Sequence, residues 1–289
     1  MDALIKHVEQ AKELNLREIY AATEMLLSEN VSDEKKVAFL RGLTAKGETA
    51  AEIAGFVEAF LERAVDPGVS EMNFSGPTID VCGTGGDKLN LFNVSTTSMF
   101  VIAAGGAVVV KHGNRGITSK SGGADVLEAL GVKIDVTPEV FRNCLEAAGV
   151  GFLFAPIYHP AFKAVVGVRK ILAQEGIRTI FNLIGPLLNP ARPECQLVGV
   201  CDPDMDSVFA DILQRLGRDS AWVVHGSTAD GGPVDEVSLL GPTRICKSGR
   251  YQALLDEEVK PEDFGMSVCD VKDLEGGDAA ENAVILTDI

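Results

Sequence analysis

The first 65 residues of the chain carry apolar positions at helical spacing, most clearly from Thr49 to Arg63. Thr49 and Glu52 have the spacing of a capping box, which marks a helix start. The apolar stripe behind it recurs at intervals of three and four, as on one face of a helix, at Ile53, Phe56, Val57, Phe60 and Leu61. We therefore predict a small all-helical domain over residues 1–70.

From residue 75 onward, short apolar runs alternate with helical segments. The runs at 78–82, 107–111, 151–155, 197–201 and 221–225 predict strands, and 132–136 is expected to be extended. Helices are expected over 122–130, from Thr137 to Gly149, and before Gly217, and Ser248-Gly249 suggests a hairpin. Such alternation is typical of a mostly parallel sheet. The pattern predicts an α/β fold over residues 75–289, larger than the helical domain.

Two glycine-rich turns follow predicted strands, with the sequences GTGGD (83–87) and KHGNR (111–115). Glycine has no Cβ, so its backbone N–H groups can approach an anion closely. The next helix should begin near Ser95 and Thr96, and a helix N-terminus also attracts anions. Ligands of such sheets bind at the carboxyl ends of strands, where both turns fall. The arrangement predicts a phosphate site.

Composition supports this interpretation and excludes others. The 289 residues, 46% hydrophobic and 24% charged, suffice for one small and one large domain. A net charge of -16 argues against a surface for nucleic acids or anionic membranes, and makes the cationic stretch 111–120 more informative. The six cysteines form no CxxC pair, which favours reduced core thiols over disulfides or a zinc site. No basic-apolar leader or bilayer-length apolar run is present, so we expect a cytoplasmic protein.

Several motifs in order resemble those of the anthranilate phosphoribosyltransferases, which share the nucleoside phosphorylase/phosphoribosyltransferase fold. They are GETAAEIAGFVEAF, GTGGD, NVST, KHGNR, SKSGGADVLEALG, RTIFNLIGPLLNP and DEVS, and they span nearly the whole chain. The resemblance implies transfer of a phosphoribosyl group from phosphoribosyl pyrophosphate to anthranilate, with release of pyrophosphate, in tryptophan biosynthesis.

The same resemblance implies how the domains are organised. Part of 160–193 should return to the helical domain, with a substrate cleft at the hinge between the domains. The family dimerises through its helical domain, although the apolar stripe of 49–63 is explained equally well by packing within that domain. The family continues with further helices beyond ENAVILTDI, so the C-terminal helices of the large domain are expected to be truncated here.

Functional residues are also carried over from the family. Magnesium is expected at Ser95, Asp235 and Glu236, although an acidic pair by itself is more often a solvated loop. Phosphoribosyl pyrophosphate is expected at Gly83, Gly86, Asp87, Asn93, Val94, Ser95, Thr96, Lys111, His112, Gly113, Asn114, Arg115, Gly116, Ile117, Thr118, Ser119 and Gly123. Anthranilate is expected at Gly83, His112, Asn114 and Arg169, because an arginine fork suits a carboxylate. No residue is assigned as a general acid or base.

Two departures from the family pattern and two rival functions bear on these expectations. Leu91 stands where the family usually has threonine, and the spacing from Arg169 to Arg178 is a few residues longer than usual, which leaves another aromatic acceptor as an alternative.

A pyrimidine nucleoside phosphorylase-like enzyme is a second alternative, but its phosphate motif differs from GTGGD and KHGNR. A nucleic-acid-binding relative is disfavoured by the acidic charge. A nicotinamide-binding Rossmann enzyme is excluded, because GTGGD is not GxGxxG.

Overall fold

The computed structural model describes residues 1–116, 120–250 and 257–289. The chain divides into two compact units. The first consists of residues 1–65 and 159–188, and the second of residues 66–158 and 189–289.

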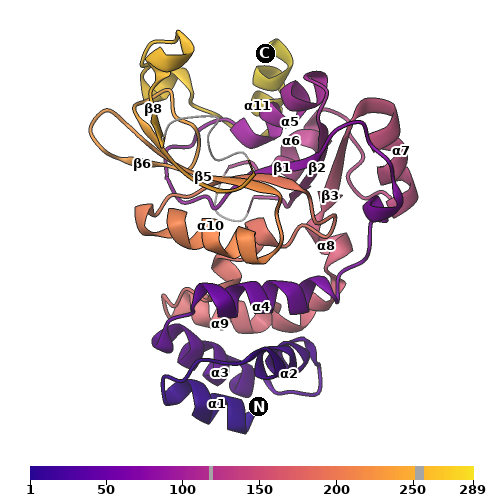
Figure 1. Cartoon of the computed structure of the whole chain (residues 1–289), viewed down its shortest axis with the longest axis vertical. Helices are drawn as coiled ribbons and strands as arrows, with labels where there is room; N and C mark the ends of the chain where they lie inside the picture. The colour runs from indigo at the N-terminus through magenta and orange to yellow at the C-terminus, as the bar shows by residue number, and fades with distance from the viewer. Residues whose placement is uncertain (117–119, 251–256) are drawn as a thin grey trace. The chain divides into compact units, whose positions relative to one another are not determined.

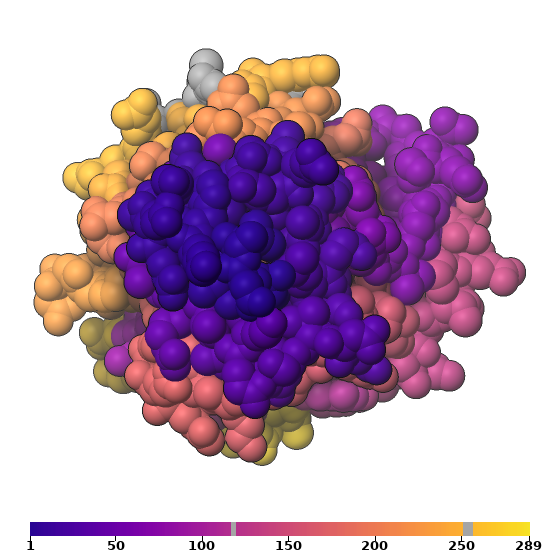
Figure 2. Space-filling model, turned by 90° about the horizontal axis from the view of Figure 1, so that it is seen from below, coloured from indigo at the N-terminus to yellow at the C-terminus, as the bar shows by residue number. Residues whose placement is uncertain are grey.

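The first unit is entirely helical where it has regular structure, in agreement with the sequence. Its elements are α1 (Asp2–Glu9), α2 (Leu16–Leu27), α3 (Asp33–Lys46), α4 (Ala50–Leu61), the 3₁₀ helix η2 (Pro160–Val165), α9 (Val166–Gln174), and the 3₁₀ helices η3 (Ile180–Asn182) and η4 (Gly185–Leu187). Helix α9 packs on α3, and η2 packs on α2. Figure 2 shows the surface that the N-terminal helices of this unit form, in indigo to violet. The later segment is therefore part of the same packed body as the N-terminal helices.

Aromatic rings join the two segments of this unit. Phe60 of α4 is fully buried, and its ring centroid lies 5.0 Å from that of Phe162 and 5.4 Å from that of Phe181. Thr49 and Glu52 form the expected capping box at the start of α4. Burying a phenylalanine side chain contributes about 1.5–3 kcal/mol, so this cluster helps to hold the two segments together.

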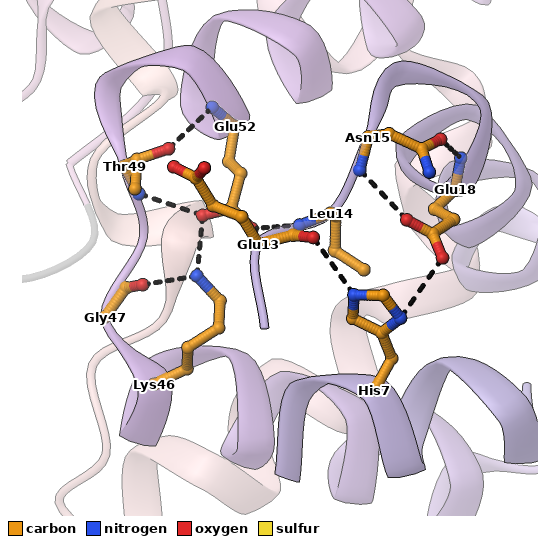
Figure 3. A network of polar contacts seen from close by, with 9 residues as sticks. All are labelled: His7, Glu13, Leu14, Asn15, Glu18, Lys46, Gly47, Thr49 and Glu52. Carbon is orange, nitrogen blue, oxygen red and sulfur yellow. Dashed lines mark hydrogen bonds and ion pairs between the residues drawn. The ribbon is translucent and has the colours of Figure 1, made fainter. Parts of the chain in front are cut away.

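A buried ion pair lies beneath the start of α4 (Figure 3). Lys46 Nζ lies 2.6 Å from Glu52 Oε2, and the two side chains are 4% and 1% exposed. Glu52 also accepts hydrogen bonds from the backbone N–H groups of Leu14 and Thr49. Burial opposes ionisation of Glu52, but the bond from Leu14 and the lysine outweigh it, so the pKa of Glu52 is lowered. The carboxylate is thus fully partnered, and it ties the α1–α2 connection to α3 and α4.

The second unit is built on an eight-stranded sheet with the order β3-β2-β1-β4-β5-β7-β8, in which β6 pairs with β5. The strands are β1 (Thr78–Gly83), β2 (Val108–Gly113), β3 (Val150–Phe154), β4 (Cys195–Gly199), β5 (Ser220–Ser227), β6 (Pro233–Val234), β7 (Thr243–Gly249) and β8 (Glu258–Val259). The pairs from β3 to β5 are parallel, and those of β6, β7 and β8 are antiparallel. The predicted mostly parallel α/β sheet is confirmed, with an antiparallel edge.

Helices cover both faces of this sheet (Figure 1). The α-helices of this unit are α5 (Val94–Ala104), α6 (Gly123–Ala129), α7 (Pro138–Ala148), α8 (Ala155–Tyr158), α10 (Asp206–Arg215) and α11 (Ala279–Asp288), and its 3₁₀ helices are η1 (Val69–Glu71), η5 (Pro203–Met205), η6 (Pro261–Phe264) and η7 (Val271–Asp273). Helices α5 and α6 pack on one face around Val81 and Val109. Helices α7 and α8 pack on the opposite face around Val108 and Val110. The alternating valines of β2 thus serve two cores.

Several local expectations change. Residues 132–136 form no strand, because Ile134 enters the core on one face of the sheet from an irregular segment and does not pair beside β3. Strand β4 begins two residues before the expected run. The hairpin is the β7–β8 pair, whose connection includes residues outside the described ones. None of the six cysteines, all described, forms a disulfide, but the expected core positions are wrong: Cys144 is exposed and the others are half-buried.

Candidate active site

The carboxyl ends of four parallel strands meet at one edge of the second unit's sheet. Strand β1 ends at Gly83 and β4 at Gly199, and these two residues are register partners. Strand β2 ends at Gly113, and β5 continues through Gly226. Because all four strands run in the same direction, their following loops share this edge. The structure therefore brings GTGGD, KHGNR and the loop that follows β6 into one region.

The loop that carries Asp235 and Glu236 rests directly on three strand-end glycines. A Cβ on Gly83 would lie 2.4 Å from Asp235 Oδ2, one on Gly199 would lie 1.6 Å from the Asp235 carbonyl oxygen, and one on Gly226 would lie 2.4 Å from the Glu236 carbonyl oxygen. No side chain could be accommodated at Gly199 without moving this backbone. The glycines are thus required for the placement of the acidic pair. Gly83 belongs to the predicted set, but Gly199 and Gly226 do not: Gly199 lies inside the predicted strand 197–201 and Gly226 directly follows the predicted strand 221–225, and neither position is a specific signal.

Each carboxylate of the pair has a defined partner from the predicted phosphate site. Asp235 Oδ2 accepts a 2.6 Å hydrogen bond from the backbone N–H of Gly85, and Glu236 Oε1 accepts a 3.1 Å hydrogen bond from Ser95 Oγ. Burial, and then the Asp87 carboxylate, raise the pKa of Asp235 to about 6. Burial, and then the charge of Asp235, raise the pKa of Glu236 to about 8. This group of acids therefore lacks the positive charge that its full ionisation would require.

The donor set suits magnesium in kind. Asp235, Glu236 and Ser95 present oxygen atoms only, and Mg²⁺ is commonly held by one or two carboxylates while substrate phosphates and water complete its shell. Among the residues that the structure describes, no group of three or more His, Cys, Asp or Glu side chains forms a ready metal cage. A fully protein-built site is thus absent from that part of the chain, but a site shared with a polyphosphate remains compatible with the crowded, buried carboxylates.

The N-terminus of α5 adjoins this acidic pair through Ser95. Val94 is the first residue of α5, and Asn93, at the N-cap, forms no side-chain cap. Thr96 is 2% exposed, and its Oγ1 would lie 2.9 Å from a Cβ on Gly123. The absence of a side chain at Gly123 therefore gives Thr96 its room.

The first turn itself is shaped by glycines in the left-handed region. Gly85 has φ +69° and Gly86 has φ +110°, values that strain other residues. Asp87 Oδ1 accepts a hydrogen bond from the N–H of Leu89, which folds the turn back on itself. GTGGD thus forms a tight turn beside Asp235.

The second turn is anchored from beneath by a buried polar network. Lys111 is 4% exposed, and its Nζ donates to the carbonyl oxygen of Val81 at 2.6 Å. Asp80 accepts from His112 N and from Asn189 Nδ2, which also donates to the carbonyl oxygen of Val110. Desolvation raises the pKa of the fully buried Asp80 in spite of these partners. The network joins β1, β2 and the segment at Asn189, and neither Asp80 nor Asn189 is among the residues predicted from the sequence.

The remaining described residues of the second turn, Asn114 to Gly116, are exposed on the surface of the second unit. Asn114 Oδ1 accepts from Arg115 N, and Gly116 N donates to Asp125 Oδ2. Arg115 pairs through two nitrogens with Glu128, at 3.1 and 2.8 Å, and lies 4.9 Å from the Phe154 ring centroid. The structure therefore directs Arg115 toward α6. The candidate residues 117–119 lie outside the described residues.

Gly113 and Arg169 complete the predicted set. A Cβ on Gly113 would lie 2.9 Å from the Phe152 ring, so this strand end also requires glycine. Arg169 belongs to the first unit, in α9, where its guanidinium lies 5.5 Å from the Phe181 ring centroid. Burial lowers the pKa of Arg169. A half-buried arginine with an aromatic partner is held in place and is suited to bind a planar carboxylate.

A separate cavity of about 490 Å³ occurs at the other edge of the sheet. It is lined by residues that precede or begin strands, among them Phe74, Ala107, Val108 and Gly149. None of the candidate residues lines it.

The described helices include none long and apolar enough to cross a membrane.

Comparison with known proteins places this architecture. Residues 75–289 match the a/b domain of the glycosyl transferase family, and residues 2–64 match its helical bundle domain. The fold and the two matches define a two-domain glycosyltransferase. The anthranilate phosphoribosyltransferases of Desulfatibacillum aliphaticivorans and Moorella thermoacetica are each 43% identical to this chain over 99% of its length, and it covers 81% and 80% of them. The chain belongs to the anthranilate phosphoribosyltransferase family.

Solved structures agree with this assignment. The anthranilate phosphoribosyltransferase from Thermus thermophilus superposes with a TM-score of 0.84 at 37% identity, over 98% of this chain and 80% of that one. The Saccharomyces cerevisiae enzyme in complex with PRPP and Mg superposes with a TM-score of 0.81 at 26% identity, over 99% of this chain and 80% of that one.

Proposed function

We propose that this enzyme transfers the phosphoribosyl group of phosphoribosyl pyrophosphate to anthranilate, giving N-(5-phosphoribosyl)anthranilate and pyrophosphate in tryptophan biosynthesis. The main observation is the acidic pair Asp235 and Glu236, whose loop packs on the strand-end glycines. The pair is hydrogen-bonded to both the GTGGD turn and the start of α5. Relatives support the substrates: the Saccharomyces cerevisiae enzyme has been solved with PRPP and Mg, and with 4-fluoroanthranilate.

In this proposal, residues 75–289 form the phosphoribosyl pyrophosphate-binding domain. Gly83, Gly86 and Asp87 shape the first turn, and Asn93 to Thr96 present the N-terminus of α5 to the anionic ligand. Lys111 supplies positive charge from beneath, and residues 112–116 with Gly123 form the opposite wall, while the roles of Ile117, Thr118 and Ser119 stay sequence predictions. Backbone N–H groups and a helix N-terminus bind phosphate oxygens without the flexibility of long side chains.

Mg²⁺ is the proposed metal, held by Ser95, Asp235 and Glu236 together with the substrate. When bound, it would neutralise charge on the leaving pyrophosphate. It would also supply the positive charge that the two carboxylates lack. We extend the proposal to Mg²⁺ because oxygen-only donors and a polyphosphate substrate both favour a hard cation.

The acceptor is proposed to bind through Arg169 and Asn114, with Gly83 and His112 beside it. In the reaction, the bond between the sugar C1 and the pyrophosphate oxygen breaks as the amine nitrogen of anthranilate bonds to C1, and that nitrogen then loses one proton. The aromatic amine is neutral at pH 7, so no strong general base is required. The chain's own contribution is to hold both substrates in line, and to stabilise developing charge.

The helical domain, placed at 1–70 with part of 160–193, is proposed to form a homodimer in the cytoplasm. Leu16 and Val166, on this unit, are 64% and 61% exposed and could serve such a contact. Light scattering of the purified protein tests this, since a monomer mass at micromolar concentration would contradict it.

The reaction is tested by following anthranilate fluorescence with purified protein, phosphoribosyl pyrophosphate and magnesium. We expect loss of fluorescence that stops when EDTA is added. If fluorescence persists while calorimetry still detects binding of phosphoribosyl pyrophosphate, the acceptor is another aromatic amine. Absence of binding by both substrates would overturn the proposal, and phosphorolysis of thymidine would indicate the phosphorylase alternative.

A further inference from the structure

The C-terminal segment of the described chain is joined to the loop that leads into α5. Leu91 forms an antiparallel bridge with Glu275, Phe92 N donates to the carbonyl oxygen of Leu274, and Gly276 N donates to that of Asn90. A Cβ on Gly276 would lie 2.6 Å from Phe92 Cα, so the two backbones are in direct contact. The position of Leu91, which departs from the family pattern, is therefore part of this joint.

Behind the joint, two asparagine side chains form a hydrogen-bonded chain. Asn282 of α11 is 3% exposed, and its Nδ2 donates to Asn93 Oδ1 at 2.8 Å. Asn93 Nδ2 in turn donates to the carbonyl oxygen of Ser121 at 3.2 Å. Asn282 Oδ1 accepts from Gly277 N at 2.8 Å. We call Asn282, Asn93 and the Ser121 carbonyl the amide chain.

Backbone groups at both ends fix the direction of the amide chain. The N–H of Gly277 can only donate, so Asn282 must present its oxygen there and its NH₂ to Asn93. The carbonyl of Ser121 can only accept, so Asn93 must present its NH₂ there and its oxygen to Asn282. Each amide therefore has one orientation that satisfies all partners, and Asn93 is held from both sides, by the Ser121 carbonyl and by Asn282.

This arrangement also affects the helix start. Asparagine at an N-cap commonly accepts from the second or third N–H of its helix, but here the Asn93 oxygen is occupied by Asn282 and makes no cap. Among the described residues, no acceptor is bonded to Ser95 N. The start of α5 thus keeps a donor available for an anion, beside the Ser95 hydroxyl that contacts Glu236.

We propose that Asn282 is a positioning residue for phosphoribosyl pyrophosphate. It acts through Asn93, by holding the start of α5 and the Ser121 backbone, which precedes Gly123, in the geometry that receives the phosphates. The inference rests on the proposed function and adds to it a residue of the C-terminal helix. It predicts that loss of Asn282 weakens substrate binding more than it slows turnover.

The test compares Asn282→Ala, Asn93→Ala, the double variant, and Asp278→Ala. Asp278 caps α11 by accepting from Ala280 N and Glu281 N, so its loss weakens the same helix but leaves the amide chain intact. Calorimetry with phosphoribosyl pyrophosphate and Mg²⁺ gives Kd for each variant, steady-state assays give KM and kcat, and thermal unfolding gives Tm.

We expect Asn282→Ala to raise Kd and KM for phosphoribosyl pyrophosphate about tenfold, as for loss of one well-placed hydrogen bond, with kcat changed less than about twofold. Asp278→Ala should lower Tm about as much as Asn282→Ala does, but should leave the Kd for phosphoribosyl pyrophosphate unchanged. The double variant should bind no more weakly than Asn93→Ala, because the two residues act in series.

Additive effects in the double variant, or an equal loss of affinity in Asp278→Ala, would show that Asn282 only stabilises α11 and would overturn the inference. Unchanged Kd in Asn282→Ala would do the same while the proposed function stands. If the unmodified protein does not bind phosphoribosyl pyrophosphate at all, the proposed function fails and the inference fails with it.

Discussion

Both units of this chain bury acidic side chains, but the pKa of the buried acid is lowered in one unit and raised in the other. In the helical unit, Glu52 accepts from two backbone N–H groups and pairs with Lys46 at 2.6 Å, and its pKa is lowered. In the α/β unit, Asp235 and Glu236 have pKa values raised to about 6 and about 8, chiefly by burial. The first acid is neutralised by the protein itself, and the other two are not.

The difference separates a structural use of buried charge from a functional one. A buried ion pair that is fully hydrogen-bonded holds segments in register, and removing one partner leaves an uncompensated charge. Acids that crowd together without a cation destabilise the protein that carries them, and such perturbed groups concentrate at functional sites. The contacts of the loop with Gly83, Gly199 and Gly226 hold the two acids in this unfavourable arrangement, for which the cation proposed above would compensate.

The largest expected effect is on turnover. Asp235→Asn combined with Glu236→Gln should lower kcat more than about 10³-fold, because electrostatic stabilisation of the leaving group is lost. The variant should fold normally, because the substitutions also remove charge repulsion. The fluorescence assay and thermal unfolding measure the two effects.

Glu257→Gln with Glu258→Gln is the matched control, since it makes the same change in charge at two adjacent exposed acids. Turnover should be unaffected there. Retained activity in the first double variant would remove the metal assignment.

The next effect is on the fold of the helical unit. Lys46→Met leaves Glu52 buried without its cation and should lower the free energy of unfolding by about 3–5 kcal/mol, as measured by urea denaturation. Lys46→Met combined with Glu52→Gln should recover only part of the loss, since glutamine is uncharged and keeps the bond from Thr49 but leaves the N–H of Leu14 without its acceptor. A change below about 1 kcal/mol in the single variant would mean that water replaces the lysine.

The smallest effect is a pH dependence of the metal-free protein. The folded-state pKa of Glu236, about 8, lies above its ordinary value of 4.5, so the folded state retains a proton that the unfolded state releases. Stability from this group is complete at low pH and is lost as pH rises toward 8. We expect Tm to be a few degrees higher at pH 6.5 than at pH 8 without magnesium.

Glu236→Gln should remove most of this slope, and magnesium with phosphoribosyl pyrophosphate should reverse it, because the metal requires the ionised form. Burial lowers the pKa of His159 below its ordinary value of 6.5. This shift makes the folded protein less stable as pH falls below 6.5, which is opposite to the effect of Glu236. The comparison is therefore made above that pH. An equal slope in Glu236→Gln would assign the effect to other groups.

Much of the fold could be predicted from the sequence because its signals are local. The capping box at Thr49, the alternating elements, and the glycine turns each depend on a few neighbouring residues, and the structure has them within a few positions. Residues 132–136 misled for the same reason: Val132, Ile134 and Val136 have strand spacing, but a strand also needs a hydrogen-bonded partner, and this segment instead packs Ile134 into the core on one face of the sheet.

The site was predictable in its parts and less so in its assembly. Motifs identified the acidic pair and both turns, but their roles in binding stay predictions. Gly199, Asn189 and Asn282 were missed, because each acts on a residue more than 30 positions away in the chain, and no local pattern reports such contacts. Arg115 also showed a limit: nothing in KHGNR reveals that Glu128 engages its side chain.

The pairing of β1 with β4 has a consequence for how the protein is made. Val81 pairs with Leu197, and residues 159–188, which lie between them in the sequence, belong to the helical unit. Each unit therefore consists of two segments that are separated in the sequence. Neither can be completed on the ribosome before residue 188 has emerged, and the central sheet must wait until β4 follows. Until then the apolar strands β1, β2 and β3 are exposed together. We expect nascent chains of this enzyme to depend on chaperones more than a protein of equal length whose domains follow one another.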